Sequence, residues 1–218
     1  MSSGNLRTVS NDMKAVRPTI LPVVPRFLNR IYQSCVDTAN KSSLFRQIFN
    51  LGLQLKTDEL YRGYVRKDSL IDKLLFWFVR QKVGGNVRLM ICGSAPLRGV
   101  VMSFLRATMG CVIVEGYGLT ECVAPVTLNV PGDMTESVGP PLPCNNIKLV
   151  DIPDMEYYAG RGQGEICVMG TNVFQGYFRS VSVQCNTQPV MLDMVRDPER
   201  TASVMDQEGW FHTGSAGA

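Results

Sequence analysis

Two short segments of the chain combine small residues with side chains that could bind a nucleotide. Gly93–Pro96 follows one apolar run, and Glu115–Glu121 follows the next apolar run along the chain. Small residues let a planar base approach the backbone, and Tyr117 offers it an aromatic face. Thr120 offers a hydroxyl and a backbone N–H to phosphate, and Glu121 offers a hard carboxylate to Mg²⁺. These residue types predict a nucleotide site.

A purely structural interpretation fits the same residues. Two tight loops with a packed tyrosine and a solvated glutamate would give the same sequence, because carboxylates are common in loops. Several standard motifs are missing from the chain: it has no Gly-x-x-x-x-Gly-Lys-Ser/Thr loop and no Gly-x-Ser-x-Gly motif. The glycine cluster at Gly160–Gly164 has the wrong spacing for a dinucleotide loop. From the residues alone, both interpretations stay open.

The elements that must position these segments follow an α/β pattern. Val87–Cys92 predicts a strand, apolar residues at helical spacing up to Gly110 predict a helix, and Cys111–Val114 predicts a second strand. This order favours a parallel βαβ unit. Open α/β sheets bind ligands at loops that follow the carboxyl ends of their strands. We therefore expect Gly93–Pro96 and Glu115–Glu121 to be loops at one sheet edge.

The first 85 residues are predicted to be mainly helical. One helix is expected over Pro25–Asp37, with proline at its first position, and a second follows Ser42. Ser69 and Asp72 have the spacing of a capping box ahead of a third periodic stretch, which Gly84-Gly85 ends. The apolar residues on one face of the second helix are Leu44, Phe45, Ile48, Leu51 and Leu55.

Beyond residue 125 the helical period is lost. Asn146–Val150 and Glu165–Met169 predict two strands of a hairpin or meander, and Pro140–Pro143 predicts a rigid corner before them. The expected fold is therefore α/β, a parallel-sheet subdomain followed by a β-rich portion. The expected boundaries are residues 1–125 for the α/β subdomain (helical over 1–85, strand-helix-strand over 86–121) and 126–218 for the β-rich portion.

Composition and charge exclude several classes of protein. The 218 residues are 45% hydrophobic and 19% charged, which indicates one globular domain or two small ones. A net charge of +3 without basic blocks argues against nucleic acid as a partner. No apolar run approaches the ~20 residues of a membrane span, and the N-terminus has no signal-peptide features. We expect no membrane segment and a cytoplasmic, reducing location.

The cysteines and the single histidine limit the metal chemistry that can be expected. His212 is the only histidine, so a site that needs two imidazoles is excluded. Seven cysteines are an odd number without a close pair, which fits neither a disulfide framework nor a zinc ribbon. We expect all seven to be buried thiols: Cys35, Cys92, Cys111, Cys122, Cys144, Cys167 and Cys185.

The second segment carries a resemblance to a known family. Tyr117-Gly118-Leu119-Thr120-Glu121 resembles the Tyr-Gly-x-Thr-Glu signature of adenylate-forming enzymes. Further stretches are similar, in order, to eukaryotic long-chain fatty-acyl-CoA synthetases: residues 18–30, 104–107, 130–134, 141–145 and 164–168. The resemblance covers nearly the whole chain, and within the family the branch with synthetases one, five and six looks most similar.

The resemblance implies a ligase that uses fatty acid, ATP, Mg²⁺ and coenzyme A. The fatty acid attacks the α-phosphate of ATP to give acyl-adenylate and pyrophosphate, and coenzyme A then displaces AMP. Thr120 and Glu121 would be the catalytic residues, with Thr120 on phosphate and Glu121 holding magnesium. The residues implied to bind the nucleotide are Gly93, Ser94, Ala95, Pro96, Glu115, Gly116, Tyr117, Gly118 and Thr120.

The chain departs from the family pattern in three ways. After Gly209–Gly214, where the family has an aspartate that bonds both ribose hydroxyls, this chain has Ser215. The family's phosphate loop and its C-terminal domain with a catalytic lysine fall outside these 218 residues, so we expect a fragment that is inactive by itself. Residues 180–196 are an insert without a family counterpart, expected to be a surface loop or translated intron sequence.

Two alternatives to a ligase fragment remain. The chain could be a non-catalytic truncated product that acts as an interaction module and associates with a full-length synthetase. It could also be a stable α/β domain with some other ligand. Members of the family lie on the cytosolic face of the endoplasmic reticulum, the mitochondrial outer membrane or the peroxisome, but no anchor is recognisable in this sequence.

Overall fold

The chain divides into two compact units. The computed structural model describes residues 9–133, 135–180 and 194–217. Unit 1 runs to Tyr117 and includes Thr127–Pro140, whereas unit 2 comprises Gly118–Val126 and the residues from Pro141 onward. The α/β fold followed by a β-rich portion is confirmed, while the subdomain boundary at residues 125 and 126 stays a prediction.

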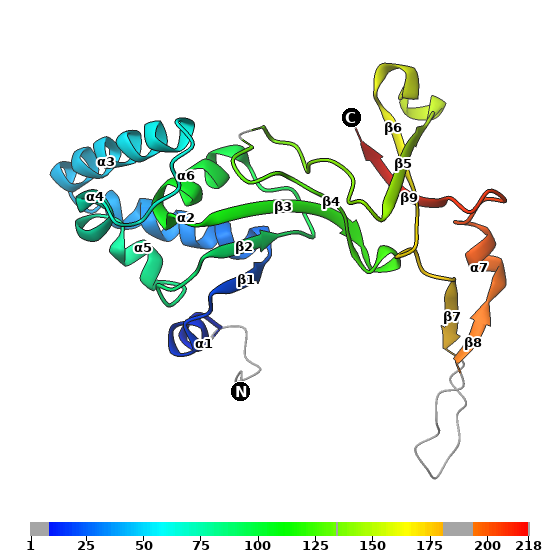
Figure 1. Cartoon of the computed structure of the whole chain (residues 1–218), viewed down its shortest axis with the longest axis horizontal. Coiled ribbons are helices and arrows are strands. Elements are labelled where there is room, and N and C mark those ends of the chain that lie inside the picture. The colour runs from blue at the N-terminus through cyan, green and yellow to red at the C-terminus, as the bar shows by residue number, and fades with distance from the viewer. Residues whose placement is uncertain (1–8, 134, 181–193, 218) are drawn as a thin grey trace, which may run out of the picture. The chain divides into compact units, whose positions relative to one another are not determined.

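Unit 1 is built on a sheet with the strand order β1-β2-β3-β4 (Figure 1). β1 (Ile20–Val23) and β3 (Val112–Leu119) both pair in parallel with β2 (Leu89–Cys92). Helix α6 (Gly99–Met109) connects β2 to β3, which confirms the predicted βαβ unit. β4 (Ala124–Leu128) follows β3 at the edge of the sheet.

The strand β1 was not predicted from the sequence. It contains Pro22, and proline argues against a strand because it cannot donate a hydrogen bond to a neighbouring strand. β1 is the first strand in the sheet order and has one neighbour, β2. An edge strand tolerates a proline, since one side of its backbone needs no partner.

The predicted loop at Glu115–Glu121 is wrong over most of its length. β3 continues to Leu119, and only a short 3-10 helix, Thr120–Cys122, follows it. The glycines that suggested a loop instead let β4 run close to β3. A Cβ atom on Gly118 would overlap the carbonyl oxygen of Ala124. Glycine within a strand often marks such a close approach between backbones.

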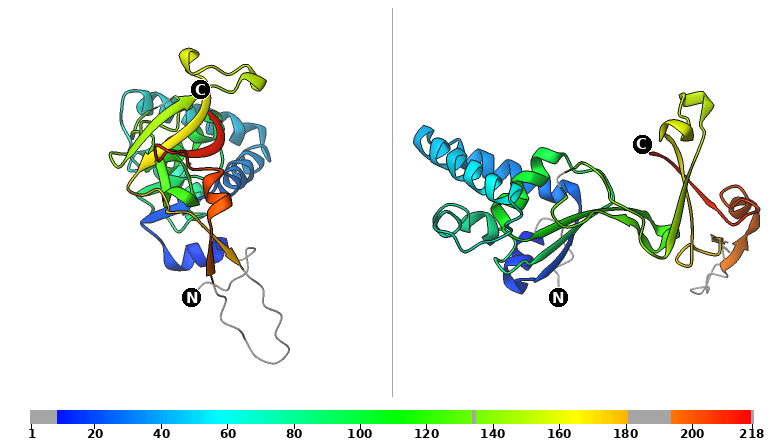
Figure 2. Two further views of the ribbon diagram at one scale, coloured as in Figure 1. Left: turned by 90° about the vertical axis from the view of Figure 1, so that its right-hand side faces the viewer. Right: turned by 45° about the horizontal axis from the view of Figure 1, so that its top comes forward.

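In the described part of the chain, five helices precede β2. Their bounds are α1 (Val9–Val16), α2 (Pro25–Ala39), α3 (Ser43–Tyr61), α4 (Leu70–Leu74) and α5 (Trp77–Gln81). Helices α2, α3 and α6 pack against one another (Figure 1), and Figure 2 gives two further views of the chain. Their packing builds one core in unit 1, which includes Leu28, Phe49, Phe76, Met90 and Leu105. The helices predicted at Pro25 and after Ser42 are confirmed.

The apolar face expected for α3 is not the face that this helix buries. Leu44, Ile48, Leu51 and Leu55 are exposed, and only Phe45 of that set is partly buried. The buried face instead carries Phe49, Gly52, Lys56 and Leu60. Gly52 lets α3 approach α4, because a Cβ atom there would overlap the Leu75 side chain. The apolar pattern was misleading because a glycine and a lysine occupy the packed face.

Lys56 can be buried because it belongs to an ion cluster that we call the Asp72 cluster: Lys56, Asp72 and Arg80. The carboxylate of Asp72 lies 2.9 Å from Lys56 Nζ and 3.3 Å from Arg80 Nη1. Asp72 also forms the predicted capping box with Ser69 at the start of α4. The third periodic stretch breaks into α4 and α5, and Gly84 and Gly85 follow with positive φ.

Unit 2 contains an antiparallel sheet with the order β5-β6-β9. β5 (Asn145–Val150) and β6 (Gly164–Gly170) pair as the predicted hairpin. Two short 3-10 helices, Pro153–Met155 and Ala159–Arg161, lie between them. β9 (Phe211–Gly217) pairs with β6 and was not predicted, because its two glycines lower the strand propensity of the segment.

A second hairpin of unit 2 flanks the predicted insert. β7 (Tyr177–Ser180) pairs antiparallel with β8 (Met194–Asp197), and the helix α7 (Pro198–Ala202) follows. The predicted surface loop covers residues 180–196; residues 181–193 lie outside the described residues, whereas Ser180 belongs to β7 and residues 194–196 belong to β8. The described ends of the insert, Ser180 and Met194, pair with each other.

Two further sequence predictions concern cysteines and membranes. Cys35, Cys92, Cys111, Cys122 and Cys167 are buried free thiols, whereas Cys144 is exposed in the turn before β5, so the prediction for Cys144 is wrong. Cys185 lies outside the described residues. Among the residues that the structure describes, no helix is long and apolar enough to cross a membrane.

Candidate functional site

Gly93–Pro96 forms the loop after β2, as predicted. Its Ser94 has a φ of 76°, in the left-handed region that non-glycine residues rarely adopt. Strained residues of this kind gather at ligand-binding sites, where the surrounding structure holds them in place. A hollow of ≈ 490 Å³ opens at this loop, and its lining includes Val23, Val24, Phe27, Ile91, Gly93 and Ser94.

The hollow lies at the carboxyl ends of the parallel strands. Val23 ends β1, and Gly93 directly follows the last residue of β2. A Cβ atom on Gly93 would stand 3.6 Å from the Gly116 carbonyl oxygen, which is ordinary contact. A Cβ atom on Gly116 would stand only 2.9 Å from the carbonyl oxygen of Thr127. The packing of β3 and β4 therefore explains Gly116, whereas Gly93 leaves room that a ligand could use.

Glu115 holds the first loop against β3. Its side chain is buried, and one carboxylate oxygen accepts a hydrogen bond of 2.9 Å from the backbone N–H of Leu97. The backbone N–H of Glu115 donates a hydrogen bond of 2.8 Å to Asn129 Oδ1, and the backbone N–H of Asn129 donates one of 2.9 Å to the carbonyl of Glu115. Burial raises the pKa of the Glu115 carboxyl, and the Leu97 hydrogen bond opposes that rise. These contacts make Glu115 a positioning residue, and its implied contact with nucleotide stays a prediction.

Tyr117 has an unusual environment for a tyrosine. Its hydroxyl oxygen is buried and has no hydrogen-bond partner among the described residues. Buried polar atoms in proteins are nearly always hydrogen-bonded, so an orphaned hydroxyl calls for an explanation. A bound nucleotide would supply acceptors, and the neighbouring strand backbone supplies none. This environment fits the implied place of Tyr117 at a nucleotide, which stays a prediction.

Only one of the two carboxylate oxygens of Glu121 forms a hydrogen bond with the described part of the protein. One of its oxygens accepts a hydrogen bond of 2.8 Å from the Tyr177 hydroxyl. The side chain is partly exposed, and the second oxygen has no hydrogen bond in the described part of the chain. Thr120 beside it is exposed, and its hydroxyl likewise makes no hydrogen bond there. An available carboxylate oxygen and an available hydroxyl suit Mg²⁺ and phosphate.

The turn that carries these two residues is strained and held by the backbone. Val123 and Ala124 follow with φ of 53° and 83°, although neither is glycine. The carbonyl of Glu121 accepts a hydrogen bond of 2.7 Å from the N–H of Phe174. The carbonyl of Cys122 accepts one of 2.8 Å from the Asn172 side chain. A strained turn fixed at several points can hold a carboxylate in one orientation.

Tyr177 is a site residue that sequence reasoning missed. Its hydroxyl reaches Glu121 from 56 residues further along the chain, and its ring packs edge-to-face on Phe174 at 4.7 Å. The guanidinium of Arg200 lies 4.2 Å from the centre of the ring. Burial raises the pKa of Tyr177, and the hydrogen bond to Glu121 raises it further. Its only signal in the sequence was its place just before the insert at residues 180–196.

Ser215 lies within β9, in a segment that Glu165 braces. The backbone N–H of Ser215 donates a hydrogen bond of 3.1 Å to Thr213 Oγ1, which itself bonds the carbonyl of Ile166 at 2.8 Å. Glu165 accepts a hydrogen bond of 2.9 Å from the N–H of Gly214. The position is therefore held in place, and serine offers one hydroxyl where two carboxylate oxygens are implied.

The structure groups the predicted site residues in two places. In unit 1, Gly93 contacts Gly116, and Glu115 ties the loop after β2 to β3. In unit 2, Glu121 joins Tyr177, a residue that was not among those predicted. Ala95 and Pro96 are exposed and make no side-chain contact that bears on their implied role.

Solved structures of adenylate-forming enzymes share this fold, with the sheet, the loop at its edge and the antiparallel unit that follows. The A domain of carboxylic acid reductase from Segniliparus rugosus, solved with AMP and a carboxylic acid, superposes with a TM-score of 0.62 at 23% identity. It matches 99% of this chain and 28% of its own. The apo structure of MatB from Rhodopseudomonas palustris gives 0.54 at 27% identity, over 98% of this chain and 30% of its own.

Sequence comparison then fixes the family. Residues 2–178 match the AMP-binding enzyme family, and the chain belongs to it. Long-chain-fatty-acid–CoA ligases 1 and 6 of Homo sapiens are 44% and 45% identical to it over 98% of this chain. Fatty acyl-CoA synthetase A of Dictyostelium discoideum is 36% identical over 99% of the chain. The chain spans 28–30% of the length of these relatives.

Proposed function

We propose that this chain is the nucleotide- and magnesium-binding segment of a long-chain-fatty-acid–CoA ligase. The observation that carries the proposal is the carboxylate of Glu121, which has one oxygen without a hydrogen bond in the described part of the chain. Glu121 stands at the end of the segment that resembles the family signature. Identities of 44–45% to ligases over nearly the whole chain support the same activity. In that reaction a fatty acid oxygen forms a bond to the α-phosphorus of ATP while pyrophosphate leaves, and the thiol of coenzyme A then displaces AMP.

The residues of this chain would bind and orient the nucleotide. Gly93–Pro96 would admit the adenine ring to the backbone, and Tyr117 would lie against the ring. Thr120 would contact phosphate through its hydroxyl. Glu121, oriented by Tyr177, would hold magnesium with its available oxygen, and the bound metal would neutralise charge on the phosphates. Fatty acid and coenzyme A belong to the proposal through the relatives, and ATP gains further support from the AMP-bound neighbour.

The proposal can be tested by nucleotide binding to the 218-residue chain. We expect ATP to bind more tightly with Mg²⁺ than without it, and we expect Glu121→Gln to remove most of that gain. A charge-assisted contact of about 1.5–3 kcal/mol corresponds to a loss of roughly tenfold or more. Glu156→Gln serves as the matched control, because Glu156 is an exposed glutamate of the same unit. Binding that ignores both Mg²⁺ and Glu121→Gln would contradict the proposal.

Association with a full-length synthetase is a second candidate function. The four exposed leucine and isoleucine side chains of α3 support it, since an apolar stripe on a helix can pack on a partner. Replacing Ile48 and Leu51 by glutamine should then abolish co-elution with a synthetase in size-exclusion chromatography. Co-elution that survives both replacements would argue against this surface.

The cellular location remains part of the proposal. The resemblance implies that the ligase family lies at the cytosolic face of the endoplasmic reticulum, the mitochondrial outer membrane or the peroxisome, whereas we propose that this 218-residue chain is itself cytoplasmic. Fractionation of cells that express it would place the protein, and a purely nuclear distribution would contradict the proposal.

A further inference from the structure

The antiparallel pairing of β6 and β9 brings three metal-ligating side chains onto one face of the sheet. Cys167 and His212 stand directly opposite each other in the register, although 45 residues separate them in sequence. Glu165 precedes Cys167 by two positions, and alternate residues of a strand point to the same face. Because the register shifts between Glu165 and Cys167, the imidazole can contact both side chains.

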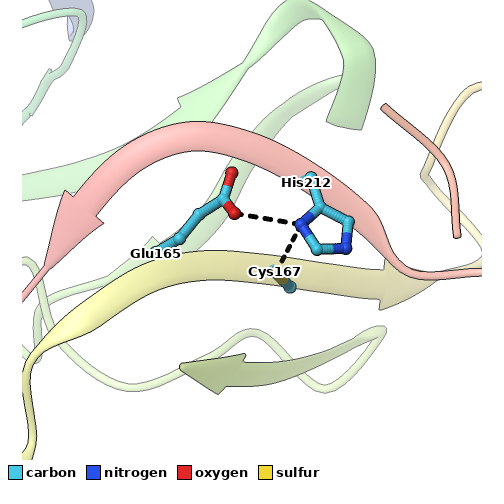
Figure 3. A group of neighbouring side chains, drawn as sticks. All are labelled: Glu165, Cys167 and His212. Atoms are coloured by element: carbon cyan, nitrogen blue, oxygen red, sulfur yellow. Dashed lines mark hydrogen bonds and ion pairs between the residues drawn. The ribbon is translucent and has the colours of Figure 1, made fainter. Parts of the chain in front are cut away.

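The ligand atoms of these residues already converge. The ring nitrogen Nδ1 of His212 lies 3.0 Å from Glu165 Oε2 and 3.4 Å from Cys167 Sγ (Figure 3). All three ligand atoms lie within 4.8 Å of one another. A tetrahedral zinc ion with bonds of about 2.0–2.3 Å sets its ligand atoms about 3.3–3.6 Å apart. The separations of 3.0 and 3.4 Å from the imidazole are close to these values, and the Glu165 and Cys167 ligand atoms lie within 4.8 Å of each other.

The surroundings hold two of the three side chains in place. The other oxygen of Glu165 accepts the N–H of Gly214 at 2.9 Å, so the carboxylate is fixed with Oε2 toward the ring. The second ring nitrogen, Nε2, faces Asp206 Oδ2 at 3.7 Å. Asp206 is in turn fixed by the backbone N–H groups of Trp210 and Glu208, at 2.8 and 3.0 Å. Metal-binding histidines commonly direct their second nitrogen to such a carboxylate.

The donor types select the metal. A thiolate, an imidazole and a carboxylate favour zinc, whereas magnesium and calcium prefer oxygen ligands alone. The Cys167 side chain is fully buried, but those of Glu165 and His212 are 21% and 31% exposed, which leaves a route for the ion. A thiolate and a carboxylate together balance the charge of a divalent ion.

The geometry points to a zinc site formed by Glu165, Cys167 and His212, with Asp206 as the partner of the imidazole. Three protein ligands leave the fourth position of the ion to water. The ion would connect His212 of β9 to two residues of β6, Glu165 and Cys167, between which the register shifts. The site is separate from the Glu121 carboxylate and does not depend on the proposed ligase activity.

The test uses Co²⁺ as a spectroscopic substitute for zinc in the metal-free 218-residue chain. We expect one equivalent to produce thiolate-to-cobalt absorption in the near ultraviolet, which Zn²⁺ displaces and excess Mg²⁺ does not. Cys167→Ser should abolish this absorption, and Cys144→Ser, which removes an exposed thiol of the same unit, should preserve it. Failure of the unaltered chain to develop the absorption would show a hydrogen-bonded trio without metal affinity and overturn the inference.

A second variant guards against misfolding of Cys167→Ser. Asp206 is partly exposed, and Asp206→Asn keeps the size of its side chain and the oxygen that accepts from Trp210 and Glu208. We expect it to weaken cobalt and zinc binding by about 10–100-fold, as outer partners of metal-binding histidines typically do. Unchanged affinity in Asp206→Asn, or thiolate absorption that persists in a folded Cys167→Ser, would overturn the site.

Discussion

Asp72 in unit 1 and Glu121 in unit 2 are both carboxylates within a short helix, yet their surroundings differ. Asp72 is fully buried, and Lys56, Arg80 and the Ser69 cap occupy both of its oxygens. Glu121 is partly exposed, and one of its oxygens accepts a hydrogen bond from the Tyr177 hydroxyl. A carboxylate that the protein satisfies completely can only stabilise the fold, whereas one with an available oxygen can still bind a ligand.

Glu115 and Glu165 extend the comparison within each unit. Glu115 is buried in unit 1 and gives its carboxylate to a backbone N–H, so it positions the loop after β2. Glu165 in unit 2 uses one oxygen on Gly214 and turns the other toward His212. In both units the number of protein partners, together with burial, separates structural carboxylates from candidate ligands.

The largest expected effect is loss of stability in Asp72→Asn. The change leaves Lys56 and Arg80 buried with one fewer opposite charge, and breaking a buried ion pair typically costs about 3–5 kcal/mol. Urea denaturation should therefore give a free energy of unfolding lower by that amount. Asp58→Asn, at an exposed position of α3, should change it by less than about 0.5 kcal/mol. A small loss in Asp72→Asn would mean that the cluster is not structural.

Replacement of Ser215 by aspartate should have the next largest effect, and in the opposite direction. A carboxylate at this position would offer two charged acceptors to the ribose hydroxyls, worth about 1.5–3 kcal/mol. We expect ATP or an acyl-adenylate analogue to bind Ser215→Asp roughly 10–150-fold more tightly in a calorimetric titration. Ser203→Asp, at an exposed position of the same unit, is the control. Equal affinities of the unaltered chain and Ser215→Asp would contradict the implied role.

Whether a feature could be predicted from the sequence depends on how far apart in the chain its residues lie. The βαβ unit, the capping box of Ser69 and the hairpin of β5 and β6 are local, and all were predicted correctly. The buried face of α3 was missed because Lys56 hides on it through an ion pair with Asp72, 16 residues away. The contact of Cys167 with His212 depends on strand register, and the contact of Glu121 with Tyr177 joins residues 56 apart, so no local pattern encodes either one.

Tyr177→Phe tests whether Glu121 must be held in one orientation by the Tyr177 hydroxyl in order to bind magnesium. The change removes one hydrogen bond to a charged acceptor but keeps the ring on Phe174, so stability should fall by only about 0.5–1.5 kcal/mol. We expect the gain in ATP affinity on adding Mg²⁺ to decrease several-fold, because the carboxylate can rotate. Tyr158→Phe, at an exposed tyrosine distant in sequence from the turn, should leave both quantities unchanged. A stability loss without any change in the Mg²⁺ effect would make Tyr177 purely structural.

Glu59 is paired like Asp72 but partly exposed like Glu121, and its replacement should change the stability least of all the variants. Hydrogen bonds from Arg66 and Lys56 lower its pKa to about 2, although its side chain is 25% exposed. A lowered pKa in the folded chain stabilises it above the ordinary value near 4.5, and this contribution disappears as the pH falls from about 4.5 toward 2. The stability difference between the unaltered chain and Glu59→Gln should therefore be constant at neutral pH and vanish in acid. Because solvent and salt screen the exposed Arg66, 1 M NaCl should shrink this difference but leave the effect of Asp72→Asn nearly intact. If salt reduced both effects equally, burial would not be what distinguishes these carboxylates.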